Sequence, residues 1–171
     1  MHQGEWQRLE LVYVAKDAPS DGCIAVIVNN PVVSGELGEA ELEEFIDDLE
    51  GRKPASAALW LKEYLPKVKA IYCFQVIHHG AEWGPGWDAI HAVQDEIWTT
   101  LGGNIQADYE GFSNEDGHHI LWQFSDRVTG AWKMAVLDKI GKWVAFEMNL
   151  GNQKHRKAFW EGKVPKGIKV L

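Results

Sequence analysis

The feature that most constrains the fold is an alternation of apolar and polar residues between positions 104 and 149. Alternation with a period of two is typical of strands with one buried face, and turn-forming residues separate the alternating segments. The pattern predicts a four-stranded antiparallel meander with strands near 104–111, 118–124, 131–138 and 142–149. Its shared core face is expected to contain Ile105, Ala107, Tyr109, Ile120, Trp122, Phe124, Trp132, Met134, Val136, Val144, Phe146 and Met148.

The same alternation predicts how these strands pair. Joining the apolar sets into one surface requires residue 124 opposite 132, residue 136 opposite 144, and Glu110 opposite His119. A slip by one residue would bury Asp108 beside Trp122, which costs several kcal/mol of desolvation. The opposite face is expected to carry Gln106, Asp108, Glu110, His119, Gln123, Lys133, Trp143 and Glu147, with Lys133 and Glu147 as direct cross-strand neighbours.

The N-terminal half predicts three further strands. Residues 9–14 and 23–28 are apolar and β-branched, and the turn formers at 18–22 between them predict a β-hairpin. The run Asn29, Asn30 and Pro31 is expected to end the second strand. Residues 70–77 are apolar on both faces, which predicts a central strand.

Four segments carry the spacing or the capping residues of helices. Leu42, Phe45, Ile46 and Leu49 form one apolar stripe, with Gly51 following as a C-terminal cap. Residues 78–86 are expected to form a loop before the third helix. The expected helices lie around 42–49, at 54–65, at 87–101 with Ile90, Val93, Ile97, Trp98 and Leu101 facing the core, and from Asn152 to Gly162.

Together these elements predict an α+β fold in which about four helices cover a largely antiparallel sheet. The sheet would combine the N-terminal hairpin, the central strand and the C-terminal meander. With 171 residues and no repeat or linker, the whole chain, 1–171, is expected to form a single domain.

Composition excludes several classes of protein. There are 25 acidic and 17 basic residues, a formal charge of −8, which argues against general binding to nucleic acid. The sequence contains no apolar run of the length that spans a membrane, and its first residues do not resemble a signal peptide. Two cysteines form no disulfide framework, so we expect a cytoplasmic protein in a reducing compartment.

Residues 70–126 contain no Lys or Arg but five of the seven histidines and nine acidic residues. Neutral imidazoles and carboxylates are ligands of divalent cations, so a metal site is one possibility for this segment. In that case Glu82 could act as general base toward a metal-bound water. No His-Glu-x-x-His or paired Cys-x-x-Cys is present, and the alternative is an ordinary polar surface. The candidate ligands are His78, His79, Glu82, Asp88 and His91.

The chain is rich in tryptophan, with nine in all. Trp98, Trp122 and Trp132 are expected in the core, whereas Trp83 and Trp87 bracket a Gly-Pro-Gly turn with little core to cover them. Tryptophan is frequent among binding hot spots, so these two are candidate binding residues. Glu110 with His119 is a second candidate, either an acid–base pair or a surface contact.

Nucleophilic catalysis finds little support in the sequence. No Gly-x-Ser-x-Gly elbow occurs, the Gly-rich turn lacks the Lys and Ser or Thr of a phosphate loop, and Cys73 lies in the middle of an apolar strand. The leading hypothesis is therefore a small acidic binding or regulatory domain without a required cofactor. It would recognise a basic protein partner or a small ligand through residues 78–87. The candidate binding residues are His78, His79, Glu82, Trp83, Trp87, Glu110 and His119.

Two alternatives remain open. The first is a metal-dependent, hydrolase-like enzyme that uses the His and Glu residues of the same loop, for which a divalent metal is the possible cofactor. The second is a homodimer, instead of a monomer, formed through the outer face or an edge strand of the meander.

Overall fold

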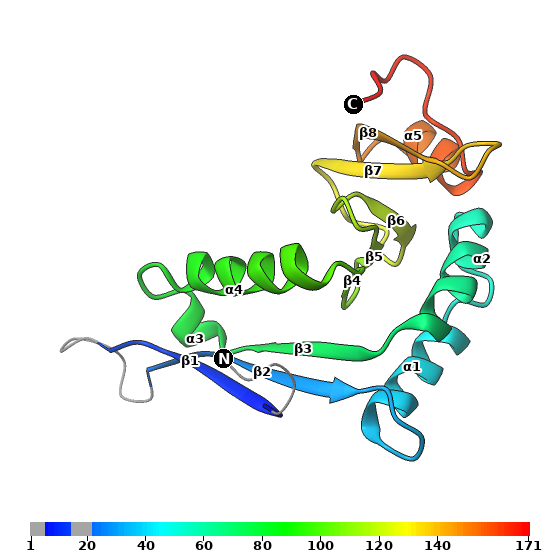
Figure 1. Ribbon diagram of the computed structural model, residues 1–171. Helices are drawn as coiled ribbons and strands as arrows, with labels where there is room; N and C mark the ends of the chain where they lie inside the picture. The colour runs from blue at the N-terminus through cyan, green and yellow to red at the C-terminus, as the bar shows by residue number, and fades with distance from the viewer. Residues whose placement is uncertain (1–5, 15–21) are drawn as a thin grey trace. The chain divides into compact units, whose positions relative to one another are not determined.

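The computed structural model describes residues 6–14 and 22–171 (Figure 1). Within these residues it confirms the α+β class, with five α-helices and two sheets of mostly antiparallel strands instead of one. The chain divides into two compact units. Unit 1 comprises the residues up to 43 and 68–102, and unit 2 comprises 44–67 and 103–171. The single domain over 1–171 stays a prediction.

Unit 1 is built on a three-stranded antiparallel sheet of β1 (Arg8–Val12), β2 (Cys23–Pro31) and β3 (Ala70–Val76), in that order. The predicted hairpin is confirmed for β1 and β2, while the turn formers at 18–21 lie outside the described residues. The prediction that 70–77 is the central strand is wrong, because β2 lies between the other two. The β2 strand also continues through Asn29 and Asn30, and Pro31 is its last residue, where its missing N–H is tolerated.

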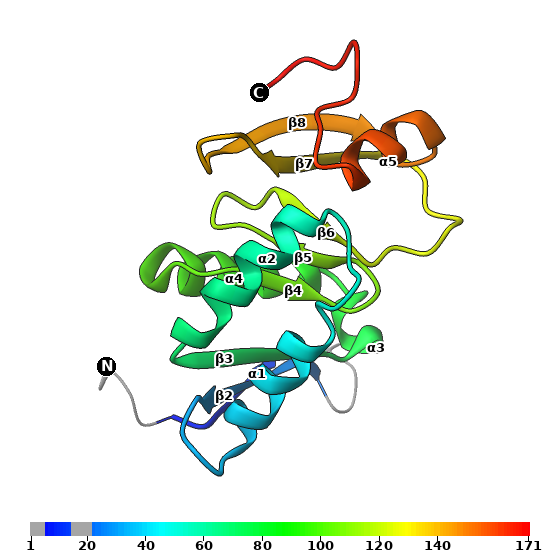
Figure 2. The same ribbon diagram turned by 90° about the vertical axis from the view of Figure 1, so that its right-hand side faces the viewer.

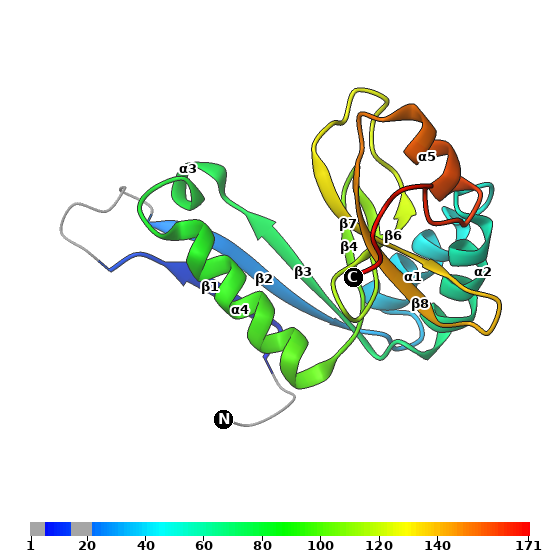
Figure 3. The ribbon, with the colours of Figure 1, turned by 90° about the horizontal axis from the view of Figure 1, so that it is seen from above.

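Two helices cover one face of this sheet. The short helix α3 (His78–Ala81) occupies part of the predicted loop, and α4 (Gly86–Leu101) follows close to its predicted bounds. Figure 3 shows α4 crossing over the strands. Ile24 and Ala25 of β2 pack with Ala81 and Ile90 in the buried cluster of unit 1. Leu101, expected in the core, is 60% exposed, because it lies at the end of α4 beyond this cluster.

Gly80 sets how closely α3 approaches β2. A Cβ at this position would lie 1.8 Å from the carbonyl oxygen of Cys23, a backbone atom that cannot rotate away. We expect Gly80→Ala to lower the free energy of unfolding by about 2–3 kcal/mol in urea titrations, because α3 must shift outward.

The matched control for this variant is Gly35→Ala. Gly35 has a φ of +82° with nothing within 4 Å of the added Cβ, so its cost is limited to about 1 kcal/mol of backbone strain. Equal losses in the two variants would contradict a close contact between α3 and β2.

The first two predicted helices are confirmed as α1 (Leu37–Asp47) and α2 (Ala55–Tyr64), and η1 (Leu65–Lys67) extends the second. The predicted C-terminal helix is confirmed as α5 (Gln153–Trp160). Its N-cap is Asn152, whose side-chain oxygen accepts hydrogen bonds from the backbone N–H groups of Lys154 and His155. No helix in the described part of the chain is long and apolar enough to cross a membrane.

The second sheet lies in unit 2 and follows chain order through its five strands. Between β7 and β8 the predicted register is confirmed, since Val136 faces Val144 and Lys133 faces Glu147. Figure 2 shows these two strands side by side with α5 next to them. The strands are β4 (Ile105–Ala107), β5 (Gly111–Ser113), β6 (His119–Trp122), β7 (Ala131–Leu137) and β8 (Trp143–Asn149).

The predicted strand 104–111 is instead a hairpin of β4 and β5. Tyr109, expected in the core, has a φ of +62° and is 87% exposed in the turn. Gly111 follows with a φ of +116°, and a Cβ there would lie 2.2 Å from the carbonyl oxygen of Leu121. Only glycine fits at this position. The chain reverses direction between Ala107 and Gly111, which pair with each other.

Two further predictions about the pairing are wrong. The β6 and β7 strands are parallel, with His119 facing Met134, so Phe124 is not the strand partner of Trp132. Residues 123–130 connect the two strands and contain no helix. His119 pairs with Ser113 instead of Glu110. Its side chain is buried beneath the hairpin and not displayed on an outer face.

The core of unit 2 lies between the sheet and α5. Its buried cluster joins the predicted apolar positions of β7 and β8 with Phe159 of α5. Trp122 is buried here, Trp132 packs against the cluster, and Trp98 of unit 1 is half-buried. On another surface of unit 2, Trp143 meets the Trp60 ring edge-on with the centroids 5.2 Å apart, so this predicted outer residue is half-buried too.

Arg156 of α5 is a buried charge that is satisfied by backbone groups alone. Its guanidinium donates to the carbonyl oxygens of Asp126 at 2.9 Å, Val128 at 2.6 Å and Leu150. It also lies 5.4 Å from the centre of the Trp122 ring. One side chain therefore fixes the connection before β7 and the segment that follows β8.

Candidate functional site

The predicted binding residues of the segment 78–87 lie on α3, at the start of α4 and in the turn between them. His78 and His79 are exposed on α3, and Glu82 is exposed at its C-terminal cap. Trp83 is held in place by Tyr13, whose hydroxyl donates to the Trp83 carbonyl oxygen and whose ring meets the indole edge-on at 4.5 Å. Trp83 therefore packs the turn onto Tyr13, the residue that follows β1, which is a structural role.

Trp87 is the aromatic residue that this segment leaves open to solvent. It is 40% exposed in the first turn of α4. The ring centroid of His78 lies 6.3 Å from that of Trp87, and that of His91, one turn further along α4, lies 6.1 Å away. We call Trp87, His78 and His91 the Trp87 surface.

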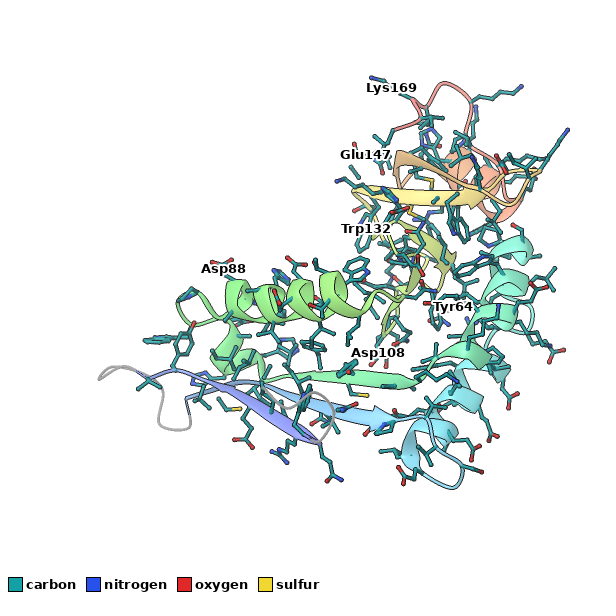
Figure 4. All side chains as sticks on the ribbon, viewed as in Figure 1. Tyr64, Asp88, Asp108, Trp132, Glu147 and Lys169 are labelled. Carbon is teal, nitrogen blue, oxygen red and sulfur yellow. The ribbon has the colours of Figure 1, made fainter. Side chains whose placement is uncertain are left out.

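Two exposed acidic residues lie close in the sequence to the residues of the Trp87 surface. Glu82 and Asp88 are both exposed, and Figure 4 shows Asp88 on the side of α4 that points away from the sheet of unit 1. Among the residues that the structure describes, no three His, Cys, Asp or Glu side chains are grouped so that they could hold a metal ion. The five candidate ligands, His78, His79, Glu82, Asp88 and His91, are thus neighbours along the chain that do not converge on a point.

The second predicted pair, Glu110 and His119, meets through the backbone. His119 is 3% exposed, and its Nε2–H donates to the carbonyl oxygen of Glu110 at 2.7 Å. Its Nδ1 lies 3.4 Å from Ser113 Oγ, which can donate to it. Burial lowers the pKa of His119 to about 4, although the backbone groups of Glu110 and Leu121 near the ring favour the charged form. The ring is therefore neutral at physiological pH and does not pair with the Glu110 carboxylate.

An open, shallow pocket of about 320 Å³ lies in unit 2, lined by Phe124 and Trp132, whose rings contact His119. Phe124 and Trp132 form an edge-to-face pair in its wall, with ring centroids 4.7 Å apart. Burial raises the pKa of Glu110, which also lines the pocket. The charged and polar lining further includes Asp108, Tyr109, Ser125 and Arg127.

Sequence reasoning identified Glu110 but missed most of this pocket. The alternation pattern predicts Tyr109 in the core and Phe124 opposite Trp132 in a strand pair. The available signal was the acidic Asp108–Glu110 segment directly before Gly111, which is typical of a turn.

Cys73 is half-buried on β3 and lies beside Glu41 of α1. Its Sγ is 3.6 Å from Glu41 Oε1, and Asn30 donates to Glu41 Oε2 at 2.9 Å. Burial and, to a smaller extent, the Glu41 carboxylate raise the pKa of Cys73 to about 11. The thiol is therefore protonated at neutral pH and is a poor nucleophile.

Side-chain geometry is the basis for a functional conclusion about this chain. No model of a protein family, no curated protein and no solved structure matches it. Two features of the described residues could support recognition of another molecule. They are the Trp87 surface of unit 1 and the pocket at Glu110 of unit 2.

Proposed function

We propose that this chain is a binding protein that recognises a basic segment of a protein partner through the Trp87 surface. The observation that carries the proposal is the exposure of the Trp87 indole between two imidazoles on α3 and α4. A large ring with few rotatable bonds loses little conformational entropy when it is buried, so it contributes strongly to binding.

Rigidity of the supporting elements favours this role. Gly80 and Ala81 of α3 are buried against β2, and Ile90 packs α4 into the same cluster. Tyr13 fixes the turn between the two helices through its bond to the Trp83 carbonyl. A partner would therefore meet a preformed surface, which reduces the entropic cost of binding.

Charge supports a basic partner. The chain has no Lys or Arg from residue 70 to residue 126, and the exposed residues Glu82 and Asp88 lie in the same segment as the Trp87 surface. Complementary charge accelerates association and disfavours acidic competitors. Indole and imidazole rings can also stack with Arg guanidinium groups and attract cations.

A selection from a random peptide library displayed on phage would test this proposal. We expect the wild-type protein to enrich peptides rich in Arg or Lys. Trp87→Ala should weaken a selected peptide about 30-fold, which corresponds to about 2 kcal/mol for a hot-spot residue. Isothermal titration calorimetry with one synthetic peptide measures the change.

Leu101→Ala is the matched control, since Leu101 is an exposed apolar residue at the other end of the same helix. It should bind the peptide as the wild type does. Asp88→Asn should slow association and reduce the salt dependence. Selected peptides without basic residues, or equal affinities of the Trp87→Ala and Leu101→Ala variants, would contradict the proposal.

A further inference from the structure

The aromatic wall of the pocket in unit 2 packs against the uncharged His119 ring. The His119 ring lies behind the Phe124 and Trp132 pair, with ring centroids 4.6 Å and 5.9 Å away, respectively. Figure 4 shows Trp132 extending from β7 toward β5 and β6, with Asp108 at the end of β4. Because His119 is neutral, it adds no positive charge that would repel a cation from these rings.

Two carboxylates line the pocket with the rings. Glu110 is half-buried, and among the residues that the structure describes no side chain donates a hydrogen bond to its carboxylate. Asp108 comes from the same turn, in which Tyr109 has a φ of +62°. A non-glycine residue held in this left-handed region costs about 1–3 kcal/mol, and such residues cluster at binding sites.

Arg127 supplies the one positive charge of the lining. Its side chain is exposed and pairs with no carboxylate among the described residues. The carbonyl groups of its neighbours Asp126 and Val128 are both bound by Arg156, so the backbone that carries Arg127 is fixed on both sides. The planar guanidinium group, with its several N–H donors, is chemically suited to a carboxylate ligand.

We propose that this pocket binds a small zwitterion, with its ammonium group against Glu110 and the aromatic pair and its carboxylate at Arg127. An ammonium group is attracted both by the faces of aromatic rings and by an unpaired carboxylate in a partly desolvated site. The volume of about 320 Å³ lies at the lower end of the range for small-molecule sites and suits a ligand of metabolite size. This site is independent of the partner surface on unit 1.

Three probes of nearly equal size separate the contributions. Glycine betaine carries both a quaternary ammonium and a carboxylate, choline keeps the ammonium alone, and 3,3-dimethylbutyrate replaces the ammonium nitrogen of betaine by carbon. Titration calorimetry on the full chain should give the order betaine, then choline, with 3,3-dimethylbutyrate weakest. Equal binding of betaine and 3,3-dimethylbutyrate, or no binding of betaine or choline up to millimolar concentrations, would overturn the proposal.

Isosteric variants locate the site. Glu110→Gln should weaken betaine and choline about tenfold each, the effect of removing one close charge. Arg127→Met should weaken betaine but leave choline unchanged. Glu147→Gln, at an exposed acid on β8 that does not line the pocket, is the matched control. If Glu110→Gln binds betaine as the control does, the ligand does not use this pocket and the proposal fails.

Discussion

Replacing Arg156 with methionine is expected to lower the free energy of unfolding by about 3–5 kcal/mol. The variant keeps the length of the side chain and its contact with Trp122, but it leaves the carbonyl groups of Asp126, Val128 and Leu150 without their donor. The hydrogen bond to Leu150 is buried and the other two are partly buried, and an unsatisfied buried acceptor costs about 1–3 kcal/mol. Urea titration followed by far-ultraviolet circular dichroism measures the loss.

Arg127→Met is the control for the removed charge, because Arg127 is exposed and its replacement should change stability by no more than about 0.5 kcal/mol. Arg156→Lys separates charge from geometry, since a lysine keeps the charge but cannot span three carbonyl groups. A loss below about 1 kcal/mol for Arg156→Met would show that water replaces the guanidinium without penalty.

His119 is expected to make the folded state lose stability in mild acid. Its pKa is about 4 in the folded protein and 6.5 in an exposed histidine, so between these values the unfolded chain binds more protons. Stability therefore decreases as the pH falls from about 6.5 to about 4, and this group adds no further loss below that. The shift corresponds to about 3 kcal/mol.

Urea titrations of the wild type and of His119→Gln at pH 7 and pH 4 isolate this contribution. Glutamine can still donate to the Glu110 carbonyl but does not titrate, so the variant should lose about 3 kcal/mol less than the wild type on acidification. His79→Gln, at an exposed position on α3, serves as the control. The same loss in His119→Gln as in the wild type would contradict a buried neutral imidazole.

The sequence pattern correctly predicted those helices and strands that pack against a neighbouring segment of the chain. The β7 and β8 strands alternate without interruption, so their facing residues, such as Val136 and Val144, follow from the period alone. The α5 helix follows equally well from its Asn152 cap. Both segments pair with, or pack onto, a neighbour in the chain.

The errors arose where a tertiary contact decided the outcome. Gly111 approaches Leu121, a residue ten positions away, and this approach converts one predicted strand into the β4–β5 hairpin. The parallel pairing of β6 with β7 is accompanied by hydrogen bonds from Arg156 to carbonyl groups of the connecting segment, 30 and 28 residues before it in the chain. Neither contact can be predicted from the alternation of apolar and polar residues along the chain.

The two candidate sites differ for the same reason. Trp87 and its two histidines lie within fourteen residues of one another, and a local reading of the segment found them. The Glu110 pocket combines the turn at 108–110 with the connection 123–130 and with Trp132 of β7, and its shape follows from the pairing that the sequence did not predict.

The central position of β2 has a consequence for amide hydrogen exchange. This strand is paired along both sides, and residues 24–27 are buried, so its amides are shielded until the sheet of unit 1 opens. In unit 2 the buried residues Met134, Ala135 and Val136 of β7 are the corresponding interior positions. Exchange at β2 and at β7 thus reports the opening of each unit, and equal protection at both would mark a chain that unfolds as one cooperative whole.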